Sequence, residues 1–417
     1  MTKKILWITS QELPVISNDL HTPIYSTGGW VTNMLNILKH ESQIVLGVAM
    51  VSKKVDSLWI KQIENIIYYV APEQKKKDIS LKDRDKILSL FQPDIIHIEG
   101  NEFPIQNTFI KTQYKTLLSL QGILSGCEPF QFGCLQIEND LINPFSCNFF
   151  ASWILFLKKQ LLFKKRIQLE TKSISQSKYL TGRTFWDRAH SYWINPQAKY
   201  FRCNRILRSS FYHEEWNLEN CNKHTIFMGN GYSPLKGLHF VIDAVHLLQQ
   251  EYPNIQLYVA GINPIIRSGI NIKKYAYGSI IQRKIHKYKL QNKIHFLGHL
   301  HEKEMLESMK QSHVYVLSSL IENSPNTLGE AMLLGMPCIA SYVGGAPEMA
   351  IDEKECLFYR ANDPYLLAWQ IKRIFENPNL SKKLGCAAKQ HAKITHNPID
   401  NKTALLKIYD DILQDKK

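Results

Sequence analysis

Short apolar runs alternate with amphipathic stretches along the first half of the chain. The runs are KILWITS (residues 4–10), IVLGVAM (44–50), DIIHIEG (94–100) and TLLSLQG (116–122). Continuous apolar runs of this length are typical of buried parallel strands. Between them, residues 31–39 and 81–91 carry apolar positions at helical spacing. This alternation predicts a parallel sheet flanked by helices.

The second half repeats the same pattern. Its apolar runs are TIFMGNG (225–231), IQLYVAG (255–261), KIHFLGHL (293–300), VYVLSS (314–319) and PCIASY (337–342), with helical stripes over 238–248 and 364–375. A chain of 417 residues is too long for one ordinary core. We therefore predict two α/β domains with a cleft between them, residues 1–207 and 225–395. A last helix within residues 396–417 could pack back on the first domain.

The segment ENSPNTLGEAMLLG (residues 322–335) follows the strand-like run VYVLSS and is the strongest candidate for chemistry. Ser324 suits an N-cap, Pro325 suits the first helical position, and Gly335 is a stop signal. The free N–H groups of a helix start favour a phosphate. Glu322 and Glu330 could hold neutral hydroxyls beside it, as a nucleotide sugar requires. The alternative is two solvated glutamates, but ligands bind at the carboxyl ends of such strands.

Three glycine-containing turns could line the same kind of site. In SPLKG (residues 233–237), Lys236 could neutralise a diphosphate, although a surface lysine is the simpler alternative. The turn fits neither a Walker A loop nor a dinucleotide fingerprint. Gly28 and Gly29, and the loop VGG (343–345), precede or follow predicted elements where a ligand could approach the backbone; plain turns are the alternative.

Composition narrows the class of protein. Hydrophobic residues make up 44% of the chain, and the net charge of +14 suggests an anionic partner. No DNA- or RNA-binding motif is recognisable, so nucleic acid is not expected. Eight cysteines without a CxxC pair argue against zinc and fit a reduced, cytoplasmic setting. No signal peptide is expected, and no apolar run is long enough to span a bilayer.

Residues 149–167, FFASWILFLKKQLLFKKRI, combine apolar side chains with lysines and an arginine. A basic amphipathic helix of this kind can lie on an anionic membrane surface, and Trp153 suits the interface. The alternative is an ordinary core helix with a solvated lysine face. Both interpretations stay open at this point.

Together these residues resemble retaining glycosyltransferase family 4, which has the GT-B fold: two Rossmann-like domains facing each other across a cleft. The motifs are the E-x7-E segment ENSPNTLGE, AMLLGMPCIAS, VGGAPE and the Lys-Gly turn before them. The phrases HIEGNEFP, SLQG, GRTFWDRA and LRSSFY in the first half resemble a bacterial subgroup that builds surface polysaccharides. The resemblance covers nearly the whole chain.

The resemblance implies a role for each site residue and no metal or cofactor. Glu322 and Lys236 would act in catalysis, with Glu322 on the donor sugar, Glu330 on the ribose and Lys236 on the diphosphate. The remaining donor-binding positions would be Gly28, Gly29, Asn230, Gly231, Ser324, Pro325, Asn326, Thr327 and Leu328. The acceptor-side positions would be His97, Gln121, Arg183 and Asp187, although a histidine in an apolar strand is by default a core residue.

Two positions depart from the family pattern. Gly231, beside Asn230, stands where the family has an arginine, and Arg183, Arg202 or Arg205 could take its place. Gln121 stands where many members have a histidine. The sequence thus predicts a peripheral membrane transferase that uses a UDP- or GDP-sugar and a lipid-linked or polysaccharide acceptor. The alternatives are an epimerase, a soluble small-acceptor transferase, or a non-catalytic nucleotide-sugar-binding protein.

Overall fold

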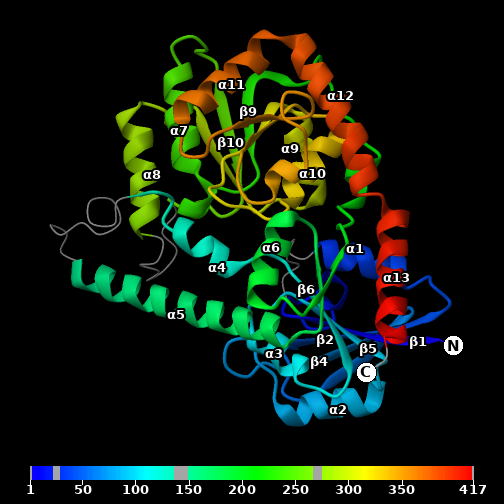
Figure 1. The fold of residues 1–417 in the computed structure, drawn as a ribbon. Coiled ribbons are helices and arrows are strands. Elements are labelled where there is room, and N and C mark those ends of the chain that lie inside the picture. The colour runs from blue at the N-terminus through cyan, green and yellow to red at the C-terminus, as the bar shows by residue number, and fades with distance from the viewer. Residues whose placement is uncertain (1, 22–28, 136–148, 266–274, 416–417) are drawn as a thin grey trace. The chain divides into compact units, whose positions relative to one another are not determined.

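The computed structural model describes residues 2–21, 29–135, 149–265 and 275–415 (Figure 1). The chain divides into two compact units. Unit 1 comprises Met1–Gly126, Lys164–Leu207 and His396–Lys417, and unit 2 comprises Cys127–Phe163 and Arg208–Thr395. Residues 127–163, which the sequence pattern assigns to the first half, thus group with the second.

Unit 1 is built on an eight-stranded sheet with the order β3-β4-β2-β1-β5-β6-β7-β8. Its strands are β1 (Lys3–Thr9), β2 (Ile44–Ser52), β3 (Trp59–Ile63), β4 (Ile66–Pro72), β5 (Ile95–Glu99), β6 (Lys115–Ser119), β7 (Tyr179–Gly182) and β8 (Lys199–Arg202). All neighbouring strands are parallel except β3, which pairs antiparallel with β4. The predicted parallel sheet is confirmed, with one antiparallel edge strand added.

Helices cover both faces of this sheet. Successive residues of a strand point to opposite faces, so each strand contributes to two cores. In β1, Ile5 and Trp7 join the core under α1 (Gly29–Leu38) and α13 (Pro398–Gln414). Leu6 and Ile8 join the opposite core under α2 (Leu81–Phe91) and α3 (Pro104–Ile110). The chain's last helix is therefore part of the hydrophobic core of unit 1. The unit also contains α6 (Phe185–Ile194), while α4 (Leu124–Cys127) and α5 (Phe149–Gln176) run across the boundary between units.

Unit 2 is built on a six-stranded sheet with the order β11-β10-β9-β12-β13-β14, parallel throughout. Its strands are β9 (Asn222–Met228), β10 (Gln256–Ala260), β11 (Ile294–Gly298), β12 (Ser312–Leu317), β13 (Cys338–Ser341) and β14 (Leu357–Tyr359). Its helices are α7 (Leu238–Leu248), α8 (Tyr275–Lys287), α9 (Glu302–Lys310), α10 (Asn326–Leu334), α11 (Pro364–Glu376) and α12 (Pro378–Thr395).

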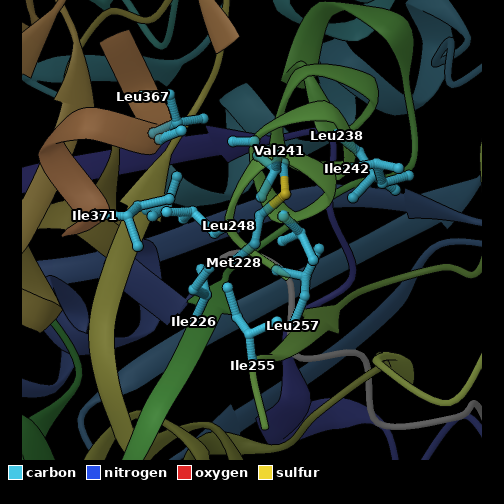
Figure 2. Packing of buried hydrophobic residues seen from close by; sticks show 14 of the residues in the cluster. Ile226, Met228, Leu238, Val241, Ile242, Leu248, Ile255, Leu257, Leu367 and Ile371 are labelled. Atoms are coloured by element: carbon cyan, nitrogen blue, oxygen red, sulfur yellow. The ribbon is translucent and has the colours of Figure 1, made fainter. Parts of the chain in front are cut away.

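The core of unit 2 follows from the helical stripe that the sequence shows over residues 238–248. Figure 2 shows Leu238, Val241 and Leu248 of α7 packed toward strand residues such as Ile226 and Leu257. In Figure 1, α7 lies beside both α8 and α11, and all three contribute to this core. Each fully buried aliphatic side chain of this kind contributes about 1.5–3 kcal/mol. This core holds the strand ends that carry the polar site.

The elements missed by the sequence pattern include short or exposed ones, but also β4, whose run IIYYVAP is mostly buried. The apolar strands and the helices α1, α2, α7, α11 and α13 lie within a few residues of their predicted bounds. By contrast, β3 has an exposed centre, so WIKQI shows no apolar run. The helices α9 and α12 carry many charged or small residues and were not predicted.

Candidate functional site

The ENSPNTLGE segment connects the carboxyl end of β12 to α10, as the sequence predicts, but the helix starts one residue late. Pro325 is the N-cap, with φ −70° and ψ 115°, and no side chain caps the helix there. The predictions of Ser324 as the N-cap and Pro325 as the first helical residue are therefore wrong. The reason is the extended backbone of Pro325, which leaves Asn326 as the first helical residue. Gly335 ends the helix at φ +75°, as predicted.

Glu330 is held by an arginine that the sequence pattern did not single out as a site residue. Its side chain is 3% exposed and lies in α10. Its two carboxylate oxygens accept from Arg208 Nε at 2.7 Å and Arg208 Nη2 at 2.6 Å. Burial raises the pKa of Glu330, and the guanidinium offsets part of that rise. The alternative of a solvated glutamate is wrong for Glu330.

Glu322 and Lys236 come together from two different turns. The Lys236 ammonium forms an ion pair with Glu322 Oε1, which also accepts from the Ser319 hydroxyl at 2.7 Å. Lys236 ends the 3₁₀ turn η5 (Pro234–Lys236), and its carbonyl accepts from the Ser318 hydroxyl at 2.9 Å. The loops after β9 and β12 are thus joined through side chains and backbone.

Two glycines allow these loops to approach one another closely. Gly237 has φ +72°, and a Cβ atom there would clash with the carbonyl oxygen of Ser318. Gly344, in the VGG loop after β13, has φ +52°, and a Cβ atom there would clash with the carbonyl oxygen of Glu322. The neighbouring Gly345 N–H donates to that same carbonyl at 3.0 Å. Larger residues would force the loops around Glu322 apart.

The other predicted donor-binding residues surround the start of α10 and the end of β9. The Thr327 hydroxyl bonds to the Tyr315 hydroxyl at 2.8 Å and lies against Gly229. Asn230 Oδ1 accepts from the Tyr232 N–H at 3.0 Å. Leu328 is fully buried in the core, so its backbone is the part that could meet a ligand. Gly231 packs against Val259 and Leu238, which explains the small residue at this position.

The predicted acceptor-side residues all belong to unit 1. Asp187 forms a capping box with Thr184 at the start of α6, and its Oδ2 accepts from the Arg183 N–H at 2.9 Å. The buried Arg183 side chain donates from Nη2 to the Gln121 carbonyl at 2.5 Å. His97 Nδ1 bonds to the Tyr409 hydroxyl at 2.7 Å. Burial lowers the pKa of His97 to about 4, so the ring is neutral near pH 7.

Glu99 is a further candidate site residue, which the sequence analysis does not name. It ends β5, is 3% exposed, and its Oε1 accepts from Arg205 Nη2 at 2.8 Å and Trp30 Nε1 at 3.0 Å. Gln121 Nε2 lies 3.5 Å from the same oxygen. The available signal was a glutamate that closes the apolar run DIIHIE. Arg205, proposed for the missing family arginine, is thus the partner of Glu99 in unit 1.

Gly28 lies outside the described residues, and Gly29 opens α1.

In α5, the described side chains of Ile154, Leu157 and Leu161 are exposed, as are those of three lysines: Lys158, Lys164 and Lys165. The side chain of Trp153 is outside the described residues. None of the helices in the described parts of the chain has the length and apolarity needed to cross a bilayer.

Comparisons with known proteins find a family model that resembles part of the chain. Residues 211–391 match the family model described as Glycosyl transferases group 1. Over 106 residues the chain is 31% identical to an uncharacterized glycosyltransferase of Methanocaldococcus jannaschii, a match that covers 25% of this chain and 23% of that protein. The chain thus matches less than a quarter of the length of this curated relative.

Solved structures resemble the chain over almost its whole length. Sucrose-phosphate synthase from Thermosynechococcus elongatus gives a TM-score of 0.72 at 15% identity, covering 98% of this chain and 99% of that one. Anabaena HepE, solved in complex with UDP-glucose, gives 0.68 at 14% identity, with 98% and 99% covered. These likenesses establish the two-domain GT-B fold that the sequence predicts. The chain has that fold, and its residues 211–391 are similar to the group 1 glycosyltransferases.

Proposed function

We propose that this protein is a retaining, metal-independent glycosyltransferase. It moves a sugar from a UDP- or GDP-sugar to a lipid-linked or polysaccharide acceptor, in the synthesis of capsule, exopolysaccharide or lipopolysaccharide on the cytoplasmic side of the membrane. One observation carries the proposal: at the start of α10, the E-x7-E glutamates and two cations, Lys236 and Arg208, gather in unit 2. The UDP-glucose complex of Anabaena HepE supports the choice of a nucleotide-sugar donor.

The arrangement suits a donor with a diphosphate between two hydroxylated groups. The first N–H groups of α10 and the Lys236 ammonium supply positive charge for the diphosphate. Glu330 supplies acceptor lone pairs for the ribose, and Arg208 holds that carboxylate in one orientation. Glu322 contacts the hydroxyls of the donor sugar. The ion pair between Lys236 and Glu322 keeps both groups ordered before the donor arrives.

In the proposed reaction, the acceptor hydroxyl attacks the anomeric carbon on the face from which the diphosphate leaves. The bond between that carbon and the phosphate oxygen breaks as the new glycosidic bond forms. The acceptor's proton passes to the departing phosphate oxygen. Lys236 and the helix start stabilise the negative charge that develops on the diphosphate. Glu322 therefore forms no covalent bond to the sugar, and a trapped glycosyl-Glu322 adduct would contradict this mechanism.

The acceptor side of the proposal rests on α5. Exposed leucines and an isoleucine beside exposed lysines suit the surface of an anionic bilayer, where a lipid-linked acceptor would be found. We expect the protein to sediment with vesicles that contain phosphatidylglycerol and not with neutral vesicles. Replacing Lys158, Lys164 and Lys165 by glutamate should abolish that binding. Replacing the exposed Lys82 and Lys86 of α2 provides the matched control.

A panel of UDP- and GDP-sugars tests the donor site directly by thermal stabilisation. We expect one nucleotide sugar to stabilise the protein. Glu330→Gln should lower the affinity for that sugar about 10- to 100-fold, because a hydrogen bond to a charged group contributes about 1.5–3 kcal/mol. Glu355→Gln is the control, since Glu355 is a buried glutamate of the same unit that pairs with His391. Equal loss in both variants would contradict the ribose assignment.

Release of the nucleoside diphosphate separates a transferase from a protein that only binds the donor. The measurement uses the stabilising donor with bacterial glycolipid extract and follows diphosphate release and product formation. Release that depends on the extract supports transfer. Donor binding without any release would identify a non-catalytic nucleotide-sugar-binding protein instead.

A further inference from the structure

Unit 1 contains a small cavity of about 40 Å³ that the proposed donor site does not use. It lies where β1, β5, β6 and β7 reach their carboxyl ends, the edge at which open α/β sheets bind ligands. Apolar side chains such as Trp7 and Met34 line part of it. Its polar lining includes His97, Glu99, Ser119, Thr181, Arg183, Asn204 and Arg205. The volume is enough for about three water-sized groups, since one needs roughly 10–15 Å³.

The lining has hydrogen-bonding atoms that the protein itself does not use. Among the described residues, Arg183 Nε, Thr181 Oγ1 and His97 Nε2 are buried without a hydrogen-bond partner. Arg183 uses Nη2 for the carbonyls of Leu120 and Gln121, at 3.4 and 2.5 Å. Buried polar atoms normally have a hydrogen-bond partner, so these three atoms on one lining indicate a missing partner.

The charge of the lining favours an anion as that partner. Two guanidiniums, the buried Arg183 and the partly buried Arg205, line the cavity with one carboxylate, Glu99. A second carboxylate nearby, Asp187, is already used by the Arg183 N–H and by the Tyr200 hydroxyl, at 2.9 and 2.5 Å. Burial lowers the pKa of Arg205 to about 9, and repulsion from Arg183 adds to the effect. A bound anion would offset both the cost of burying the Arg205 charge and its repulsion from Arg183.

We propose that this cavity binds a small anionic group, the carboxylate or phosphate of a ligand, through Arg183, Arg205 and Thr181. The binding itself does not depend on the proposed transferase function. Its assignment to the acceptor does rest on that function, and it specifies an acceptor with an acidic substituent, such as a uronic acid or a sugar phosphate. A free inorganic or carboxylate anion is the other source of the same chemistry.

Titration calorimetry with acetate, inorganic phosphate, glucuronate and glucose, at constant ionic strength, tests the site. We expect the anions to bind and glucose not to bind. Tighter binding of glucuronate than of acetate assigns the site to an acidic sugar, and equal binding assigns it to a free anion. No binding by any of the three anions overturns the proposal.

Variants tie the binding to this cavity. Thr181→Val keeps the side-chain shape and should weaken the best anion about 10-fold, and Arg183→Gln should weaken it about 100-fold. If Arg183→Gln does not fold, Thr181→Val still decides. Thr9→Val is the matched control, because Thr9 is equally buried at the end of β1 but does not line the cavity. Unchanged affinity in Thr181→Val overturns the proposal.

The same samples keep this test separate from the test of the donor site. Stabilisation by the UDP- or GDP-sugar reports on unit 2 and should be unchanged in Thr181→Val. Anion binding without donor binding would contradict the transferase function while leaving the anion site intact. Donor binding without anion binding would contradict the anion site while leaving the transferase function intact.

Discussion

Each unit buries one glutamate against one arginine, but the two pairs differ in what else holds the carboxylate. In unit 2, both oxygens of Glu330 accept from the same guanidinium, that of Arg208. In unit 1, Glu99 receives one nitrogen of Arg205 at its Oε1, which also accepts from Trp30. The two arginines are three residues apart in the chain, on either side of the boundary between units.

The difference shows how the same ion pair can serve two purposes. The two-point contact with Arg208 fixes the orientation of Glu330 and leaves lone pairs for a ligand that needs acceptors. The one-point contact with Arg205 leaves guanidinium nitrogens available beside Arg183, so that unit 1 offers donors instead. This contrast is the basis for proposing hydroxyl groups as ligands of unit 2 and an anion as the ligand of unit 1.

The largest expected effect comes from removing Arg208. Arg208→Met leaves a buried carboxylate without its partner, and we expect a loss of about 3–5 kcal/mol in the stability of unit 2 at pH 7.5. Arg205→Met should cost unit 1 only about 2 kcal/mol, because Trp30 still donates to Glu99. Hydrogen exchange measured separately on peptides from β12 and from β5 reports on each unit.

Lysine at each position controls for charge. Arg208→Lys keeps the charge but loses the two-point contact, so it should recover only part of the stability. Arg205→Lys should recover most of it, since Glu99 uses a single nitrogen of Arg205. Equal costs for the two methionine variants would show that the number of contacts does not distinguish the pairs.

Acid should act on the two sites with opposite signs. His97, whose pKa falls from 6.5 to about 4 on burial, takes up a proton more readily in the unfolded chain. Its contribution to stability is therefore complete above about pH 6.5 and is lost as the pH falls toward 4, a total of about 3 kcal/mol. Glu330, whose pKa is raised by burial, takes up a proton more readily in the folded chain, so it opposes the loss.

Urea unfolding between pH 7 and 4.5 measures this difference. His97→Gln should flatten the decline in stability, and Glu330→Gln should steepen it. His313 at the start of β12 is buried, and its pKa is likewise lowered to about 4. The stability of the wild-type protein therefore falls with the pH even though the protonation of Glu330 opposes this loss. A decline that His97→Gln leaves unchanged would mean that His97 does not contribute to it.

The sequence predicted much of the fold because most strands of the two sheets are buried on both faces, unlike β3 and β8. Residues such as Ile5, Leu6, Trp7 and Ile8 alternate between two cores, so the whole run is apolar and recognisable. The ENSPNTLGE segment and Lys236 were also recognisable, because they are short motifs with fixed spacing. Arg208 and Glu99 were not, because a buried ion pair joins residues more than 100 positions apart in the chain and leaves no local pattern.

A smaller effect on stability is expected at Gly344, which lies against Glu322 in unit 2, and at Gly100, which follows Glu99 in unit 1. Gly344→Ala places a Cβ atom against the backbone carbonyl of Glu322 at φ +52°, and we expect a loss of about 2 kcal/mol. Gly100→Ala, at φ +85°, meets the side-chain amide of Gln106 instead of a backbone carbonyl, so we expect a smaller loss of about 1 kcal/mol. Urea unfolding of both variants gives the comparison. A larger loss for Gly100→Ala would reverse it.

The smallest effect on stability should come from Lys236, although its effect on donor binding should be large. Its ion pair with Glu322 is partly exposed, and such pairs contribute about 1 kcal/mol or less. Lys236→Met should therefore leave the urea midpoint almost unchanged while weakening a nucleotide sugar about 10- to 100-fold. Lys284→Met is the control, since Lys284 forms a comparably exposed ion pair with Asp243 in the same unit.

If Lys236→Met costs as much stability as Arg208→Met, then Lys236 supports the fold of unit 2 just as Arg208 does. If it changes only donor affinity, the two cations differ in role: Arg208 orients a carboxylate, and Lys236 meets the ligand.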